Sequence, residues 1–213
     1  MMFSDDMISE LESKVEQAIS RYRYIHTLGV KHAALKISER CYLGDVSEIA
    51  AAALLHDISK EYSTAEQYNM IKQSELQLSD TDLMSEVVLH AFTAPFIIKR
   101  DFAEFATENI ISSVFNHTTG DPNMSLFDEI IFVADYIEDG RKHESCVEVR
   151  NKLYESMNAA RDREECIMYL HNATISALEN TIINLVRNKQ VINERTVATR
   201  NAFLARVPVP LVY

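Results

Sequence analysis

The near-absence of residues that break helices is the feature that most constrains the fold of this sequence. The 213 residues include only four glycines and four prolines, and Pro208 and Pro210 stand near the C-terminus. Glycine and proline are the residues that most often interrupt a helix, so most of the chain is free to form helical segments. Hydrophobic residues make up 47% of the sequence, which is too apolar for an intrinsically disordered chain. We therefore predict an all-α globular protein.

Capping sequences mark several of the expected helix starts. In Asp45-x-x-Glu48, Ser63-x-x-Glu66 and Ser125-x-x-Asp128 the first side chain can accept a hydrogen bond from an early backbone N–H. Pro95 is expected to kink or split the fifth helix. The expected helices cover about residues 5–20, 23–40, 46–59, 64–74, 81–99, 104–116, 126–138, 144–159, 163–188 and 194–205.

Nothing in the sequence divides the chain into separate units. It contains no repeat of fixed period, no low-complexity tract and no linker rich in Pro, Gly or Ser. Apolar residues recur at spacings of three and four between Ile167 and Val186, which favours a helix that packs on the core over a cofactor site. We therefore expect one domain over residues 1–213.

Charge and composition exclude several classes of partner. The 21 Lys and Arg against 32 Asp and Glu give a net charge of −11, whereas a protein that wraps nucleic acid needs a basic face. No apolar run approaches the ~18 residues of a membrane span, and the first residues lack the features of a signal peptide. Cys41, Cys146 and Cys166 form no CxxC pair, which fits a reducing compartment. We expect a cytoplasmic protein without nucleic-acid or membrane partners.

The positions of the glycines exclude common nucleotide-binding motifs. Gly29, Gly44, Gly120 and Gly140 are too far apart to form GxGxxG or a P-loop, and the sequence has no GxSxG elbow. Rossmann-type, kinase and serine-hydrolase chemistry are therefore not expected.

An adjacent histidine and aspartate end a strongly apolar helix. The run from Ile49 to Leu55 contains only Ile, Ala and Leu, and it leads directly into His56 and Asp57. Burying an unpaired carboxylate costs several kcal/mol, so a buried Asp57 would need a partner. The alternative is that the helix ends here and both side chains face water or cap a neighbour.

Four further polar residues lie on or beside apolar helix faces. Asp135 interrupts the apolar segment 130–137, although a salt bridge to a nearby base would also explain it. His90 borders a core side, where a hydrogen-bonded core histidine is the simpler interpretation. His117 closes an apolar helix and could merely interact with its dipole. His26 lies in a helix of mixed polarity and taken alone is compatible with a surface position.

The combination is far more specific than any single member. Four imidazoles and two carboxylates on five different helices are a pattern by which helical bundles build metal sites in their cores. Imidazole and carboxylate donors without thiolate suit iron, manganese, cobalt or zinc, and six ligands can hold two ions if one carboxylate bridges them. We therefore predict a dinuclear hydrolytic centre. Its expected ligands are His26, His56, Asp57, His90, His117 and Asp135.

Two basic residues share helix faces with these ligands. Lys60 follows Asp57 by three residues, so a continuing helix would place its ammonium beside the metals as a phosphate clamp or acid. The alternative is a solvated lysine that favours the helix dipole. Arg23 precedes His26 by three residues, and its guanidinium could grip a phosphate or form a surface salt bridge.

The order of these residues resembles the HD-domain metal-dependent phosphohydrolases, and in particular their bacterial YqeK branch. The resemblance extends from about residue 21 to residue 204. It rests on the blocks Arg23-x-x-His26-Thr27-Leu28-Gly29-Val30, Leu54-Leu55-His56-Asp57-Ile58-Ser59-Lys60, His117-Thr118-Thr119-Gly120, Ala134-Asp135-Tyr136-Ile137-Glu138-x-x-Arg141 and Ala198-Thr199-Arg200-Asn201.

This resemblance implies an all-α HD-domain helical bundle with the activity of a symmetrical bis(5′-nucleosyl)-tetraphosphatase. Such an enzyme cuts diadenosine tetraphosphate into two ADP at a di-iron centre. The resemblance assigns His26, His56, Asp57 and Asp135 to one ion and His90 and His117 to the other, with Asp57 bridging. Asp57 and Lys60 are the expected catalytic residues, and the expected substrate-binding residues are Arg23, Lys60, Thr118, Thr119, Gly120 and Arg141.

The sequence departs from the family pattern at one ligand and leaves alternatives open. The fourth block usually reads His-Gly, whereas this chain has His90-Ala91.

Residues 21–140 would carry the metal motifs, and 141–213 would add helices that complete the domain. Manganese or cobalt could replace iron. The expected partner is a small dinucleoside polyphosphate, and a homodimer remains open. Hydrolysis of another nucleotide, or a non-catalytic nucleotide-binding module, are the alternative functions.

Overall fold

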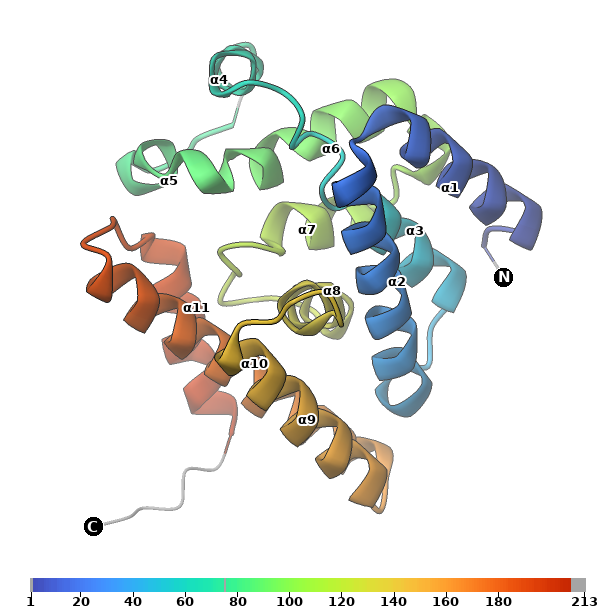
Figure 1. Ribbon diagram of the computed structural model, residues 1–213, viewed down its shortest axis with the longest axis vertical. Coiled ribbons are helices and arrows are strands. Elements are labelled where there is room, and N and C mark those ends of the chain that lie inside the picture. The colour runs from blue at the N-terminus through green and yellow to red at the C-terminus, as the bar shows by residue number, and fades with distance from the viewer. Residues whose placement is uncertain (1, 75, 208–213) are drawn as a thin grey trace.

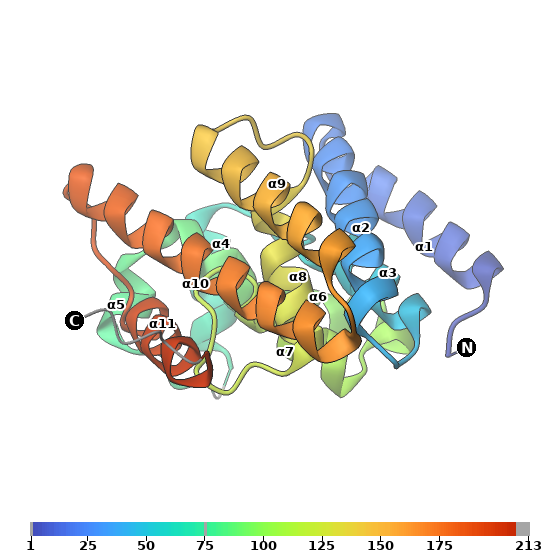
Figure 2. The same cartoon turned by 90° about the horizontal axis from the view of Figure 1, so that it is seen from below.

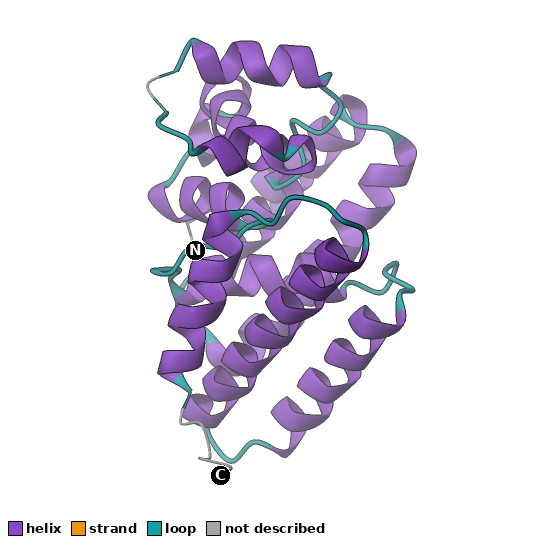
Figure 3. Ribbon diagram, turned by 90° about the vertical axis from the view of Figure 1, so that its left-hand side faces the viewer, coloured by secondary structure: helices purple, strands orange, loops and turns teal. Residues whose placement is uncertain are grey.

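Helices account for all the regular secondary structure of the part of the chain that is described. The computed structural model describes residues 2–74 and 76–207, so Pro208 and Pro210 lie outside it, and no strand occurs within those ranges (Figures 1 and 3). The α-helices are α1 (Asp5–Ala18), α2 (Arg21–Cys41), α3 (Val46–Leu55), α4 (Thr64–Lys72), α5 (Asp80–Met84), α6 (Leu89–Asp101), α7 (Glu108–Asn116), α8 (Leu126–Ile137), α9 (Glu144–Ala159), α10 (Arg163–Arg187) and α11 (Glu194–Arg206). The 3₁₀ turns are η1 (Glu86–Val88) and η2 (Ala103–Phe105). The predicted all-α class is confirmed.

The helix expected over residues 81–99 is the main departure from the sequence analysis. Ser79 starts a separate short helix, α5, through a capping box with Asp82. The chain then breaks at Ser85, whose φ of −102° and ψ of 79° are not helical, and passes through η1 into α6. The predicted split at Pro95 is wrong, because α6 continues through this residue. The helix expected over 104–116 begins later, at Glu108, after the N-cap Thr107.

The predicted caps are present. Ser63 and Ser125 form complete capping boxes with the acidic residues three positions on. Asp45 caps α3 by accepting from the backbone N–H of Ser47. Glu48 does not complete a box there; it is buried and accepts hydrogen bonds from the side chains of Thr107 and Asn109. One acidic side chain thus ties the start of α3 to the start of α7.

Helix α8 occupies the centre of the molecule. It is seen end-on in Figure 1, with α2, α7 and α10 packed against it. Figure 2 shows α9, α10 and α11 on the other side of α8 from α3 and α1. In α3, every residue from Ser47 to Leu55 is buried, because this helix lies between α2, α7 and α1. A smaller apolar cluster of Ile71, Leu89 and Phe92 joins α4 to α6.

The C-terminal helices are tied to this centre by polar contacts. Glu129 of α8 is 1% exposed and accepts hydrogen bonds from His171 and Thr174 of α10. Arg200 of α11 pairs with Glu179 of α10 at 2.5 Å. Within residues 2–74 and 76–207, no helix is long and apolar enough to cross a membrane.

The turn that follows α7 packs closely against α11. Gly120 has a φ of +72°, and a Cβ built there would lie 2.7 Å from the Cγ2 of Thr199. Both its backbone conformation and its space therefore favour glycine.

Substitution of this glycine tests the packing of α11 on the turn. We expect Gly120→Ala to lower the free energy of unfolding by about 1–3 kcal/mol, because alanine is strained at positive φ and collides with Thr199. Urea denaturation measures the loss. Thr199→Ser removes the nearest methyl group, so the double variant should lose less than the sum of the single losses. Unchanged stability of Gly120→Ala would contradict the close contact.

Candidate metal centre

The helix that leads into His56 and Asp57 ends earlier than the sequence suggested. α3 stops at Leu55, and the next residues form turns in which Ile58 donates to Leu55 and Lys60 donates to Asp57. The expected helix to residue 59 is therefore wrong. The turn still places the Nζ of Lys60 3.5 Å from Asp57 Oδ1 and 3.2 Å from His90 Nε2.

Asp57 is the hub of the centre. Its carboxylate is 5% exposed and is faced by four histidines from different segments. Oδ1 lies 3.2 Å from His90 Nε2 and 3.7 Å from His117 Nε2. Oδ2 lies 3.8 Å from His56 Nε2 and 3.9 Å from His26 Nε2. The alternative in which His56 and Asp57 face water does not apply, since both are buried.

Two of the imidazoles are oriented by their own helices. His56 Nδ1 lies 2.7 Å from the carbonyl of Ala53, and His117 Nδ1 lies 2.6 Å from the carbonyl of Val114. A carbonyl oxygen only accepts, so each Nδ1 carries a proton, and the lone pair of the ring in its neutral form then lies at Nε2. In both rings Nε2 is the nitrogen that faces the oxygens of Asp57. A cation satisfies this arrangement, so the donor set fits a metal.

The pKa values of His56 and His90 indicate neutral rings in the buried part of the centre. Burial lowers the pKa of His56 and that of His90 to about 4, so both rings are neutral at pH 7. Burial raises the pKa of Asp57, but interactions with His56, His117 and His90 outweigh burial and hold that pKa well below its ordinary value. The buried part of the centre thus offers the neutral imidazoles of His56 and His90 beside an ionised carboxylate.

His26 and Asp135 form the more exposed edge of the centre. His26 Nε2 lies 3.0 Å from Asp135 Oδ1 and 3.3 Å from His56 Nε2. Burial lowers the pKa of His26, but hydrogen bonds to Asp135 and Glu138 outweigh burial and raise it to about 9. A cation bound at this edge would therefore have to displace a proton from His26.

All six predicted ligands come together in space. Ligand atoms of His26, His56 and Asp135 lie within 4.8 Å of one another, and so do those of His56, Asp57 and His117. His90 lies beside the second group, because its Nε2 is close to Asp57 Oδ1 and is 3.1 Å from the Nε2 of His117. The division of the six ligands between two ions remains a prediction.

The predicted phosphate-binding bases border the same edge. The side chains of Arg23, Lys60 and Arg141 are 27%, 32% and 44% exposed. Arg141 Nη2 lies 2.7 Å from Asp135 Oδ1. Arg23 Nη1 lies 3.8 Å from Asp57 Oδ2, and its Nε lies 3.0 Å from Glu61 Oε1. Arg23 therefore forms the salt bridge that was its alternative role while also facing the centre.

The predicted turn of Thr118, Thr119 and Gly120 offers one unsatisfied polar atom. The Oγ1 of Thr118 is buried and has no hydrogen-bond partner among the described residues. Thr119 donates to the carbonyl of Gly120 at 3.3 Å, and Gly120 donates its N–H to Asn116. No hydrogen bond joins Thr119 or Gly120 to the six predicted ligands in the described structure, and the role of both residues in substrate binding stays a prediction.

Sequence reasoning gave no role to Glu138, although it lies three residues after Asp135. Glu138 is 4% exposed, and its Oε1 accepts from His26 Nδ1 at 3.1 Å. Its other oxygen accepts from the backbone N–H of Gly140 at 2.5 Å. Carboxylates that hold the second nitrogen of a metal-binding histidine fix its ring and raise its basicity. The Asp135-x-x-Glu138 spacing was the available signal.

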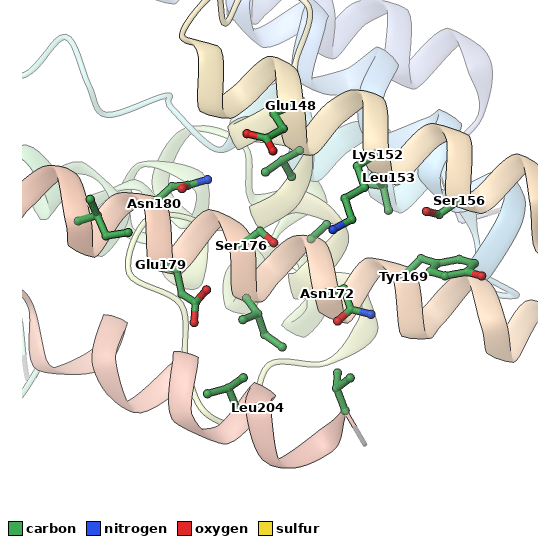
Figure 4. A pocket seen from close by; sticks show the side chains of 15 residues that line it. Glu148, Lys152, Leu153, Ser156, Tyr169, Asn172, Ser176, Glu179, Asn180 and Leu204 are labelled. Carbon is green, nitrogen blue, oxygen red and sulfur yellow. The ribbon is translucent and has the colours of Figure 1, made fainter. Parts of the chain in front are cut away.

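A groove of about 570 Å³ lies apart from this centre, between α9, α10 and α11 (Figure 4). Lys152, Tyr169 and Asn172 contribute polar atoms to its lining. None of the six predicted ligands lines it. The chemistry of the chain is therefore assigned to the histidine and aspartate cluster and not to this groove.

Comparison with known proteins identifies the class to which this fold and site belong. The HD domain family model matches residues 23–140, which is more than half of the chain and contains all six predicted ligands. The chain belongs to the HD domain family.

Named relatives narrow the comparison. The chain is 31% identical over 192 residues to "Bis(5'-nucleosyl)-tetraphosphatase, symmetrical" of Halalkalibacterium halodurans, covering 89% of this chain and 93% of that protein. The Bacillus subtilis protein of the same name is 31% identical over 187 residues, 88% of this chain and 92% of that protein. The crystal structure of a "predicted HD superfamily hydrolase involved in NAD metabolism" from Clostridium acetobutylicum superimposes with a TM-score of 0.78 at 26% identity, covering 97% of this chain and all of that one.

Removal of the carboxylate behind His26 tests the exposed edge of the centre. We expect Glu138→Gln to weaken binding of one metal ion by about 10–100-fold, because His26 loses a charged partner at Nδ1. Calorimetric titration of metal-free protein with Mn²⁺ measures the effect. Asp139→Asn is the matched control, because Asp139 is adjacent and its side chain is 75% exposed. Equal affinities in both variants and the wild type would contradict the role of Glu138.

Proposed function

We propose that this protein is a metal-dependent hydrolase that cleaves diadenosine tetraphosphate symmetrically into two ADP. The observation that carries the proposal is the cluster of four imidazoles around buried Asp57, with bases along its exposed edge. The names of the Halalkalibacterium and Bacillus relatives, which the chain matches over most of its length, support the choice of substrate and the symmetry of cleavage.

Six side chains would hold two divalent ions. His26, His56, Asp57 and Asp135 are proposed for one ion and His90 and His117 for the other, with Asp57 shared. Iron is the proposed metal, and the same donors accept manganese or cobalt. Bound ions would supply the positive charge that activates water and neutralises phosphate oxygens.

Bases at the edge of the centre would bind the polyphosphate. The chain has a net charge of −11, so a polyanion is attracted by local groups and not by the field of the whole protein. Arg23 is held by Glu61 and Arg141 by Asp135, which fixes two guanidinium groups beside the ligands. Planar guanidinium groups suit paired hydrogen bonds to phosphate oxygens.

Lys60 is the proposed catalytic lysine, acting as a phosphate clamp or an acid, and its Nζ lies closer to Asp57 than the Nη1 of Arg23 does. Its Nζ contacts Asp57 and His90 and remains 32% exposed, so it can reach both the buried ligands and an incoming phosphate. There it would hold an oxygen of the scissile phosphate and hydrogen-bond the departing ADP. The buried hydroxyl of Thr118 is a further candidate donor.

The same structure supports proposals about the domain and the compartment. We propose that residues 1–213 form one domain, because α10 packs directly on α8, which carries Asp135. Cys41, Cys146 and Cys166 are free and buried, which supports a reducing cytoplasm.

Analysis of reaction products tests the proposed activity. Reduced protein supplied with Fe²⁺ should convert diadenosine tetraphosphate to ADP alone, as resolved by ion-exchange chromatography. ATP with AMP would contradict symmetrical cleavage. Turnover of another nucleotide with none of this substrate would favour a different HD phosphohydrolase.

Substitution of the hub separates an enzyme from a nucleotide-binding module. We expect Asp57→Asn to lose bound metal and to lower turnover at least ~1,000-fold, because both ion sites share its carboxylate. Asp101→Asn alters an exposed aspartate paired with Arg100 and should keep metal and activity. Metal content by plasma emission spectroscopy and initial rates are the readouts. Full activity in Asp57→Asn would rule out the assigned centre.

The role of Lys60 is tested by removing its charge. Lys60→Met should lower kcat by about 100-fold while the protein retains its metal, since one donor to the developing phosphate charge is lost. Lys99→Met, on the exposed end of α6, is the control. A variant with normal kcat would return Lys60 to the solvated lysine considered from the sequence.

A further inference from the structure

The start of α6 and the end of α7 meet through two ring contacts. His90 and His117 lie with ring centroids 5.0 Å apart, and Phe92 and Phe115 also lie 5.0 Å apart. In each segment the phenylalanine is two residues from the histidine, and His117 keeps helical φ and ψ just after α7, so the two side chains are about 200° apart around the axis. The same two segments therefore present a histidine pair to Asp57 and a phenylalanine pair to the opposite side.

Arg195, in the first turn of α11, covers the phenylalanine pair. Its guanidinium carbon lies 5.8 Å from the centroid of the Phe92 ring and 5.4 Å from that of Phe115. Such contacts attract a cation to aromatic faces. The guanidinium of Arg195 thus contacts one ring from each of the two segments that carry His90 and His117.

The same guanidinium pairs with two acidic residues from different segments. Arg195 Nε lies 3.3 Å from Asp82 Oδ2 of α5, and Nη1 lies 3.5 Å from Asp121 Oδ2. Asp82 is 1% exposed, so it depends on its partners to remain ionised in the interior. Asp121 belongs to the turn that follows His117. The ion pair therefore connects Arg195 to the turn that begins at a predicted ligand.

Backbone and side-chain contacts fix the start of α11. Asn193 Nδ2 donates to Asp82 Oδ1 at 2.8 Å, and Asn193 Oδ1 accepts from the backbone N–H of Arg195 at 2.8 Å. Thr199 donates to the carbonyl of Arg195 and packs against Gly120. Arg195 is therefore held on a segment that is itself anchored to α5 and to the turn after α7.

We propose that Arg195 is a positioning residue that sets the spacing of His90 and His117 and thereby the affinity of the ion they would bind. It acts through Phe92, Phe115 and Asp121. The inference rests on the proposed function, in which His90 and His117 are ligands. Arginine suits this position because its planar, forked guanidinium can face rings and reach two carboxylates at once.

The test compares two substitutions in α11. Metal-free wild type, Arg195→Gln and Arg200→Gln are titrated with Mn²⁺ by calorimetry, and urea denaturation measures their stability. Arg200 is the matched control because it pairs with Glu179 of α10, so its loss loosens α11 without freeing the phenylalanine pair. Arg195→Lys keeps the charge but not the planar fork, and serves if Arg195→Gln does not fold.

We expect the wild type and Arg200→Gln to bind two ions. Arg195→Gln should bind one ion with unchanged affinity and the second at least about tenfold more weakly. Arg195→Lys should also weaken the second ion, with stability close to that of the wild type. The Co²⁺-loaded forms should differ in their visible absorption spectrum only for the Arg195 variants.

Each contrary outcome has a separate meaning. Unchanged binding of both ions by the Arg195 variants would overturn the positioning role. Equal losses for both ions in Arg195→Gln and Arg200→Gln would show that α11 supports the fold alone, and would also overturn it. A wild type that binds fewer than two ions would overturn the ligand assignment itself, and with it this inference.

Discussion

The structure depends on one buried carboxylate. Asp57 is removed from water, and an ion of its size left unpaired in the interior costs several kcal/mol, so the fold must bring partners to it. His26 of α2, His90 of α6 and His117 after α7 come from three different segments of the chain. His56 is the neighbour of Asp57 in the sequence. Because each of these residues belongs to a different segment, the position of Asp57 fixes how the surrounding helices can pack. The apolar surface of α3, buried from Ser47 to Leu55, supplies the packing energy that keeps the charge inside.

Much of the fold could be predicted from the sequence, and so could the grouping of six polar side chains, Asp57 among them, because both rest on local signals. Few glycines and prolines together with caps at Asp45, Ser63 and Ser125 define most of the helices. Polar residues beside apolar runs mark the six predicted ligands. The break at Ser85 was missed because no glycine or proline marks it, and a serine is compatible with a helix or a turn.

The remaining site residues could not be found in the same way. Glu138 contacts His26, which lies far from it in sequence, and Arg195 meets Phe92 and Phe115 only after α11 has docked. Such partners are defined by tertiary packing. In the sequence, a charged residue near a helix end has the same pattern whether its side chain contacts a buried ring or faces water. The resemblance to a family supplied ligands in sequence order, but the contacts behind them required the structure.

The hydrogen bonds of His56 and His117 to Ala53 and Val114 have a second consequence. Each histidine directly follows its helix, and the carbonyl that accepts its Nδ1 proton is one of the last four, which have no partner within the helix. Each hydrogen bond therefore both orients a ring and satisfies a carbonyl at the end of a helix. Replacement of either histidine in evolution would leave one buried carbonyl without its hydrogen-bond donor. A descendant that lost both histidines would need new donors at the ends of α3 and α7.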